Sequence, residues 1–222
     1  MTQAVHLPND EQAFDALCEK ISLDLSEKSY ALVDGFLSLP QVEAVLDELN
    51  RYFREGDFKD AGIGAAHQFQ VQKEIRKDKI RWIDPNAAGD ASRTFVQKLR
   101  YLMQFINRTC YLGLKDFEMH YTVYPKGAFY KRHLDQFKVS DHRRLTFLCY
   151  LNKDWAVSDG GLLRLYLKNH DGQEIPFDIS PLAGRFLCFR SDLLEHEVLV
   201  CHRERFSLTG WMLDQLNELT FL

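Results

Sequence analysis

The sequence predicts a β-sandwich or β-barrel core with helices packed against its outside, which makes it a mainly β protein of the α+β class. Before residue 112, apolar residues recur at helical spacing. After it, short apolar or alternating segments follow one another with turn residues between them. Helices first and strands afterwards are typical of helices that cover a β core. No repeat or linker interrupts the chain, so we expect one domain over residues 1–222, with 1–112 as mainly helical support and 113–214 as the core.

Three segments of the first half place apolar residues three and four positions apart, which is the spacing of one helix face. They are residues 10–25, 41–53 and 92–110. Pro40 suits the first turn of the second helix, and Ser92 is a suitable N-cap for the third. Residues 30–33 predict a short strand. Residues 68–83 predict a hairpin with its bend near Asp78.

Short strands account for most of the second half. Segments that contain Gly, Pro, Asp or Ser separate them at regular intervals, which indicates a sandwich or barrel. The expected strands cover residues 117–124, 129–133, 145–151, 162–167, 173–179, 185–190, 196–200 and 205–213.

The composition excludes several classes of protein. Of the 222 residues, 45% are hydrophobic and 27% are charged, which is typical of a globular chain and not of a disordered or fibrous one. The 28 basic and 32 acidic residues give a net charge of −4, which disfavours binding of nucleic acid over the whole surface. We expect no membrane span and no secretory signal. The five cysteines form no C-x-x-C pair, so we expect a reduced, cytoplasmic protein, with a monomer favoured.

The pattern His133-Leu-Asp135 is the most informative part of the chain. On a strand, side chains two residues apart point to the same face, so an imidazole and a carboxylate can meet at one metal ion. His196 is the best candidate for a third ligand because it opens a later predicted strand. Two histidines and one carboxylate form the facial triad of non-haem iron oxygenases, which leaves positions open for a cosubstrate and dioxygen. Taken alone, the H-x-D pattern also fits an ordinary pair on a surface strand.

Arg205 favours the oxygenase interpretation. It follows His196 by nine residues and is expected on the next strand, so both side chains can face one barrel mouth. A buried guanidinium there needs an anion, and the distal carboxylate of a dicarboxylate is a suitable bidentate partner. A salt bridge with Glu204 is the alternative. His202 and Glu204 form a rival pair that no later histidine completes. The other histidines lack spaced acidic partners and are expected at the surface or in loops: His6, His67, His120, His142 and His170.

Two motifs are narrower than the metal pattern, namely Arg76-Lys-Asp-Lys-Ile-Arg-Trp82 and Tyr150-Leu-Asn-Lys-Asp-Trp155. Together with residues 124–135, 160–164 and 196–211, they make the chain resemble the 2-oxoglutarate/Fe(II)-dependent prolyl hydroxylases. The resemblance runs from about residue 72 to residue 214. It is specifically to the hypoxia-inducible-factor (EGL-nine) branch of this family and its bacterial relatives.

The resemblance implies a double-stranded β-helix, or jelly roll, and an enzyme that uses Fe(II), 2-oxoglutarate and dioxygen. It also allows for ascorbate as a further small-molecule ligand. The implied catalytic and metal-binding residues are His133, Asp135 and His196. The implied cosubstrate pocket consists of Arg205 and Tyr150, which would hold the distal carboxylate, and of residues that would line it: Tyr124, Thr209, Trp211, Leu163 and Val198.

The resemblance further implies a mobile substrate loop over residues 68–83, in which Trp82 closes over a peptide. Asp78 and Arg143 would form an ion pair between this loop and the core. From the residues alone, Trp82 and Tyr150 also fit ordinary aromatic residues of a β core.

The implied reaction is hydroxylation of a prolyl residue at C4 in a protein substrate, with release of succinate and carbon dioxide. Elongation factor Tu is a candidate substrate in bacterial relatives. One alternative is a related oxygenase that acts on another residue or on a small molecule, and another is a binding module on an inactive oxygenase scaffold. A third alternative is a nucleic-acid demethylase, which only a local basic cluster suggests. The net charge argues against it. The cluster consists of Lys131, Arg132, Lys138, Arg143 and Arg144.

Overall fold

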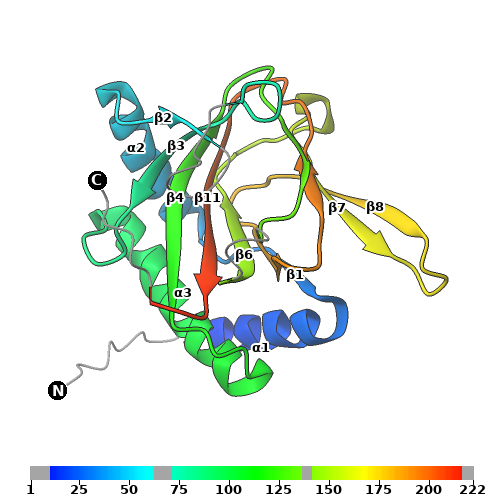
Figure 1. Cartoon of the computed structure of the whole chain (residues 1–222). Coiled ribbons are helices and arrows are strands. Elements are labelled where there is room, and N and C mark those ends of the chain that lie inside the picture. The colour runs from blue at the N-terminus through cyan, green and yellow to red at the C-terminus, as the bar shows by residue number, and fades with distance from the viewer. Residues whose placement is uncertain (1–10, 63–71, 137–141, 217–222) are drawn as a thin grey trace.

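Two antiparallel sheets face each other and form the walls of a jelly roll (Figure 1). The structure, a computed structural model, describes residues 11–62, 72–136 and 142–216. The larger sheet has seven strands in the order β1-β9-β6-β11-β4-β3-β2, and the smaller has four in the order β5-β10-β7-β8. The mainly β, α+β class and the jelly roll are therefore confirmed.

The strands are β1 (Tyr30–Val33), β2 (Lys59–Asp60), β3 (Lys79–Ile83), β4 (Asp116–Tyr124), β5 (Tyr130–His133), β6 (Arg143–Tyr150), β7 (Leu163–Lys168), β8 (Glu174–Ile179), β9 (Phe186–Arg190), β10 (His196–Val198) and β11 (Arg205–Leu213). The helices are α1 (Glu11–Lys28), α2 (Leu39–Glu55), α3 (Asp90–Cys110) and the short 3₁₀ helix η2 (Val157–Asp159).

The three α-helices cover the outer face of the larger sheet and share one apolar core with it. Pro40 lies in the first turn of α2, as its sequence position predicts. The N-cap predicted at Ser92 is wrong, because α3 begins at Asp90 and Ser92 is buried inside it. Glu48 of α2 binds this helix end instead, since its carboxylate accepts the Ala91 backbone N–H at 3.1 Å. A partner from another helix thus replaces the local cap.

β6 lies at the centre of the fold and is buried on both of its faces. Phe147 and Cys149 pack toward the helices, whereas Leu148 and Tyr150 pack toward the smaller sheet. This double burial explains why the second half of β6, from Phe147 to Tyr150, is continuously apolar. The neighbouring strand β11 alternates in the same way, and Leu208 belongs to its helix-facing side.

The hairpin predicted over residues 68–83 is not what the described part of this segment forms. Residues 68–71 lie outside the described residues. Asp78 is not at a bend, because the next residue begins β3, which pairs with β2 on one side and β4 on the other. The sequence pattern of residues 59–60 is too short to predict the partner strand β2.

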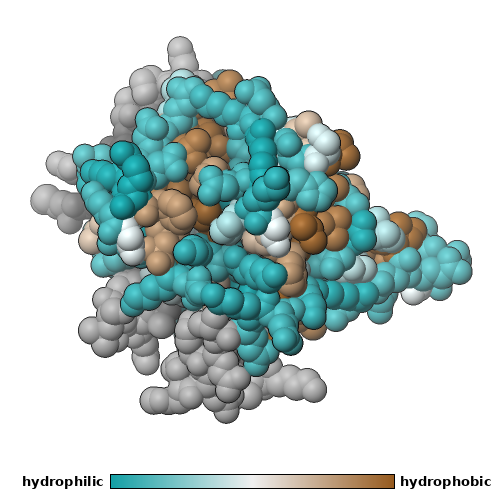
Figure 2. All heavy atoms as spheres, turned by 90° about the horizontal axis from the view of Figure 1, so that it is seen from above, coloured by the Kyte–Doolittle hydropathy of each residue, from teal (hydrophilic) through white to brown (hydrophobic). Residues whose placement is uncertain are grey.

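The molecular surface seen from above is mainly hydrophilic, with apolar side chains gathered near its middle (Figure 2). The β7–β8 hairpin projects away from the body of the molecule (Figure 1). Within the described residues, no helix combines the length and the apolar character that crossing a bilayer requires.

Candidate metal centre and cosubstrate pocket

The side chains of His133, Asp135 and His196 meet between the two sheets. One candidate ligand atom from each residue lies within 4.8 Å of the other two. His133 Nε2 is 3.4 Å from Asp135 Oδ1, and His196 Nε2 is 3.5 Å from Asp135 Oδ2. The strand pairing that sets His196 opposite His133 brings the two imidazoles together across β5 and β10. This is the only cluster of its kind within the described residues.

Both imidazoles are held so that Nε2 is free to bind a metal. His133 Nδ1 lies 2.7 Å from the Lys131 carbonyl, and His196 Nδ1 lies 3.3 Å from the Leu194 carbonyl. A carbonyl only accepts hydrogen bonds, so each Nδ1 holds the hydrogen and each Nε2 presents its lone pair. Burial, together with the neighbouring His133, lowers the pKa of His196 to about 4, which keeps this imidazole neutral at neutral pH.

Asp135 has a buried carboxylate that faces the two histidines and also receives a hydrogen bond from Thr146. Its Oδ2 accepts a hydrogen bond from the Thr146 hydroxyl at 2.8 Å, and Thr146 is in turn 2.9 Å from the Ser191 hydroxyl. Burial alone would raise the pKa of Asp135, but His196 and His133 outweigh it and lower this pKa below its ordinary value. Two imidazoles and one ionised carboxylate are a donor set that suits Fe(II). The supporting residues Thr146 and Ser191 carry no sequence signal.

Arg205 is fully buried, and its guanidinium has no hydrogen-bond partner among the described residues. Within the described part of the chain, Nε, Nη1 and Nη2 of Arg205 have no acceptor, and the Tyr150 hydroxyl is unpartnered as well. The guanidinium lies 4.9 Å from the ring centroids of both Tyr150 and Tyr124. Burial raises the pKa of Tyr150, so its hydroxyl keeps its hydrogen. A buried cation beside a hydroxyl donor fits an anionic ligand, because unpartnered buried charge is costly.

The other predicted pocket residues lie on the same inner side of the fold. Tyr124 pairs with Arg205 in the β4–β11 ladder, and Val198 pairs with Leu163 in the β10–β7 ladder. Trp211 has an indole N–H that is buried without a partner in the described chain. By strand alternation, the inner face of β11 carries the odd-numbered residues from Arg205 to Trp211.

Trp82 differs from its predicted position. We expected it in a mobile loop, but it lies on β3, directly opposite His120 of β4 in the sheet. Its ring packs edge-on against His120 at 5.0 Å and is 37% exposed, so it forms part of the wall at the edge of the site. His120 itself was expected at the surface and is 2% exposed, between Trp82 and Trp211.

The predicted ion pair between Asp78 and Arg143 is replaced by two others. Arg76 binds both carboxylate oxygens of Asp78, at 2.8 Å and 2.5 Å. The two residues are only two positions apart in the chain. Arg143 instead binds Glu118 at 2.7 Å and lies 3.5 Å above the ring of Trp211.

Arg76 and Asp78 support the cluster of His133, Asp135 and His196 through aromatic packing. The guanidinium of Arg76 lies 4.2 Å from the Tyr130 ring centroid, and the Tyr130 ring stacks on His133 at 3.6 Å. The Asp78 side chain is fully buried. The Asp78 carboxylate therefore holds Arg76 in place, and Arg76 in turn packs on the Tyr130 ring that stacks on His133.

Replacing Asp78 with alanine is expected to lower the free energy of unfolding by about 3 kcal/mol, because the change leaves the largely buried Arg76 without its counter-charge. Urea unfolding measures this loss. The control is Asp60→Ala, which breaks the exposed pair between Lys73 and Asp60 and should cost less than about 1 kcal/mol. Equal losses in the two variants would contradict the assigned role of the Arg76–Asp78 pair.

The basic cluster does not form a free cationic patch among its described arginines. Arg132 binds Glu174 and Glu195, Arg143 binds Glu118, and Arg144 binds Asp214. Lys138 lies outside the described residues. Arginines that are committed to carboxylates do not provide the phosphate contacts of a nucleic-acid surface.

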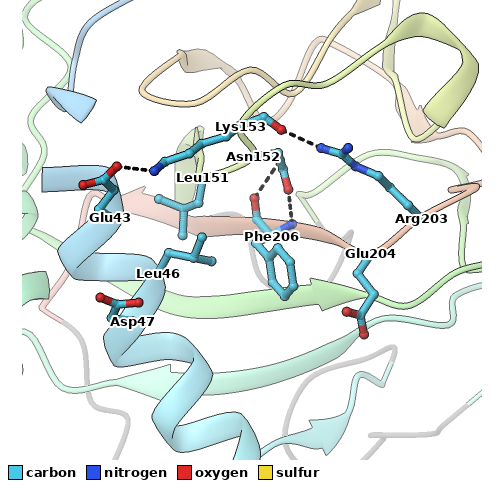
Figure 3. Close-up of a pocket in the computed structure, with 9 residues that line it drawn as sticks. All are labelled: Glu43, Leu46, Asp47, Leu151, Asn152, Lys153, Arg203, Glu204 and Phe206. Carbon is cyan, nitrogen blue, oxygen red and sulfur yellow. Dashed lines mark hydrogen bonds and ion pairs between the residues drawn. The ribbon is translucent and has the colours of Figure 1, made fainter. Parts of the chain in front are cut away.

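A hollow of about 570 Å³ lies on the helix-facing side of the large sheet, between α2 and the start of β11 (Figure 3). Leu151 and Phe206 line it, next in sequence to Tyr150 and Arg205, which point the opposite way. Asn152 donates to the Phe206 carbonyl at 3.1 Å and accepts from its N–H at 2.7 Å. The asparagine of the Y-L-N-K-D-W motif thus anchors the backbone beside Arg205.

Comparison with known proteins defines the class of this fold and site. The model of the 2OG-Fe(II) oxygenase superfamily matches residues 119–213, which include the three clustered residues and Arg205. The chain is 31% identical over 211 residues to a hypoxia-inducible factor prolyl hydroxylase of Caenorhabditis elegans. That match covers 90% of this chain and 28% of the relative's length.

Two solved structures are similar over nearly the whole chain. A prolyl-4-hydroxylase of Pseudomonas putida is 37% identical with a TM-score of 0.80, and the match covers 90% of this chain and 100% of that one. A prolyl hydroxylase of Trichoplax adhaerens, in complex with a hypoxia-inducible factor oxygen degradation domain peptide fragment, is 27% identical with a TM-score of 0.82. That match covers 95% of this chain and 94% of the other.

The chain belongs to the prolyl hydroxylases of the 2OG-Fe(II) oxygenase superfamily. Enzymes of this family use Fe(II), 2-oxoglutarate and dioxygen, so these three predicted cofactors are confirmed at the level of the family, whereas ascorbate stays a prediction.

Proposed function

We propose that the protein hydroxylates a prolyl residue at C4 in a protein substrate. One atom of dioxygen enters the new alcohol and the other enters succinate, while 2-oxoglutarate loses carbon dioxide. Similarity to a prolyl-4-hydroxylase supports the choice of residue. The Trichoplax adhaerens enzyme was solved with a peptide, which supports a protein substrate. Elongation factor Tu is the candidate that we would test first.

The observation that carries this proposal is the fully buried guanidinium of Arg205 beside the Tyr150 hydroxyl, neither of which has a hydrogen-bond partner in the described part of the chain. Two sets of donors face the interior of one jelly roll. The His-Asp-His cluster suits a metal ion, and the Arg205–Tyr150 pair suits a carboxylate. A ligand that chelates a metal at one end and carries a carboxylate at the other satisfies both sets, and 2-oxoglutarate is such a ligand.

Each residue of the site has a defined task in this proposal. His133, Asp135 and His196 would hold Fe(II), and this set of three ligands would leave room for 2-oxoglutarate and dioxygen to bind. Arg205 and Tyr150 bind and orient the distal carboxylate. The bound metal supplies the activation of dioxygen.

The remaining pocket residues exclude water and shape the pocket. The pocket has an apolar wall beside Arg205, which Tyr124, Leu163 and Val198 form. Thr209 and Trp211 line the inner face of β11. Asp78 and Arg143 act indirectly, Asp78 through Arg76 and Tyr130, and Arg143 by covering the Trp211 ring.

The test is incubation of the purified protein with Fe(II), 2-oxoglutarate and proline-containing peptides of elongation factor Tu. We expect succinate to form and one peptide to gain the mass of an oxygen atom, with fragmentation placing it on a proline. A peptide with that proline replaced by alanine serves as the control. Succinate formation with no oxidised proline in any peptide would point to another substrate. If neither 2-oxoglutarate binding nor turnover occurred, the oxygenase assignment of this chain would fail.

A further inference from the structure

The inner face of the sheet carries a line of hydrogen-bonded side chains, of which the proposed function assigns a task only to Thr209. In the β4–β11 ladder, His120 lies opposite Thr209, and Thr122 lies opposite Ser207. His120 Nδ1 is 2.9 Å from the Thr122 hydroxyl, and this hydroxyl donates to Thr209 at 3.1 Å. Thr209 and Ser207 are 3.2 Å apart. The chain of contacts therefore runs from the buried His120 to the strand residues next to Arg205.

The direction of these hydrogen bonds follows from counting hydrogens. His120 Nδ1 also lies 3.3 Å from the Tyr121 carbonyl, which can only accept, so Nδ1 is the nitrogen that carries the hydrogen. Thr122 has a single hydroxyl hydrogen. Because Thr122 accepts from His120, its own hydrogen goes to Thr209.

Thr209 consequently keeps its own hydrogen available as a donor, either directly or through Ser207. Within the described chain, neither hydroxyl has any further side-chain partner. Ser207 is fully buried and lies opposite Tyr150 in the β6–β11 ladder, whereas Thr209 is partly exposed toward the pocket. The hydroxyl hydrogen of Thr209 or Ser207, at the end of this series of hydrogen bonds, thus adds to the donors of Arg205, Tyr150 and Trp211. A pocket lined in this way by donors suits an acceptor-rich ligand.

We propose that His120 is a positioning residue that acts through Thr122 to direct the Thr209 and Ser207 hydroxyl hydrogens toward the bound 2-oxoglutarate. This inference rests on the proposed function, because it takes 2-oxoglutarate as the ligand of the pocket. His120 remains neutral in this role, since burial lowers its pKa to about 4. Hydrogen bonds in such a chain polarise and strengthen one another, so loss of the first donor weakens the last one.

Binding of 2-oxoglutarate to the Zn(II)-loaded protein, measured by calorimetry without oxygen, tests the inference. His120→Leu keeps the apolar packing against the tryptophans but removes the donor. Thr122→Val removes the next link. We expect each change to weaken binding by about five- to tenfold, which is the range for one hydrogen bond between neutral groups. His120→Asn places an amide N–H where Nδ1 was, and should bind within about twofold of the wild type.

Two further results decide between positioning and simple packing. The double variant His120→Leu/Thr122→Val should bind no more weakly than Thr122→Val alone, because both changes break the same chain of bonds. In addition, ¹⁵N NMR of the histidine-labelled wild type should place the His120 hydrogen on Nδ1. Additive losses, a hydrogen on Nε2, or a His120→Asn variant as weak as His120→Leu would each overturn the inference.

The inference and the proposed function fail in different ways. A wild-type protein that binds no 2-oxoglutarate would remove both of them. A wild-type protein that binds 2-oxoglutarate, with the His120→Leu variant unchanged in affinity, would remove the inference and leave the proposed function standing.

Discussion

Replacing Arg205 with methionine is expected to weaken 2-oxoglutarate binding by about 30-fold or more, because truncating one partner of a buried charged hydrogen-bonded pair costs roughly 2–5 kcal/mol. Methionine keeps much of the volume of the arginine stem and removes only the donors. Calorimetric titration of the Zn(II)-loaded protein with 2-oxoglutarate measures this change.

The same substitution is expected to have the opposite effect on the ligand-free protein. Without ligand, the three guanidinium nitrogens of Arg205 lie buried without acceptors in the described chain. An unpartnered buried polar group costs about 1–3 kcal/mol, so the variant should unfold at the same or a higher denaturant concentration than the wild type. Binding and stability thus move in opposite directions, which general damage to the fold would not produce.

Arg203 provides a matched control for this experiment. It lies two residues earlier on the outside of the fold, where its guanidinium covers the Trp155 ring and lies 3.4 Å from Asp159. Arg203→Met should leave 2-oxoglutarate affinity unchanged. Unchanged affinity in Arg205→Met, or an equal loss in Arg203→Met, would refute the assignment of Arg205 to the distal carboxylate.

Replacing Asp135 with alanine is expected to abolish Fe(II) binding and turnover. Losing a hydrogen-bond partner of a metal ligand already costs about 10–100-fold in metal affinity, so losing a ligand itself should cost more than about 100-fold. The variant leaves two neutral imidazoles, which no longer balance the charge of the ion. Metal titration and succinate formation measure the two effects.

The fold of the Asp135→Ala variant should remain close to that of the wild type. In the structure, the Asp135 carboxylate receives one hydroxyl hydrogen bond, from Thr146, and otherwise faces the two histidines. Its loss in the metal-free protein should change the free energy of unfolding by about 1 kcal/mol. Asp192→Ala, which breaks a partly exposed pair with Arg190, is the control and should keep full metal affinity. Stoichiometric, tight Fe(II) binding by Asp135→Ala would show that the ligand set is wrong.

Much of the fold follows from local patterns. The apolar spacing predicts all three α-helices to within a few residues at each end, and it predicts β1 and the strands of the second half. These elements are predictable because each buries one face, or in β6 both faces, against a single large core. The exception is the segment around β3, where a two-residue partner strand and a long-range pairing with β4 leave no periodic signal.

The candidate site divides in the same way. The H-x-D spacing and the later histidine predict the group of three candidate metal ligands, because the alternation of side chains along a strand depends only on neighbouring residues. The partner of Asp78 could not be predicted, since Arg76 and Arg143 are both arginines within plausible reach and only the folded backbone selects between them. The burial of His120 was missed because a lone histidine on a strand carries no sign of which face it occupies.

By itself, the sequence determined the kinds of elements, the residues that alternate on each strand and the chemistry of the site residues. Only the tertiary structure decided which strands became neighbours. It therefore decided that His196 faces His133, and that Arg205 is sealed from water with no acceptor among the residues the structure describes. The physical reason is that alternation and amphipathicity are properties of a few consecutive residues. Burial and ion-pair choice depend on contacts between segments far apart along the chain, and their energies are set by the surroundings that those contacts create.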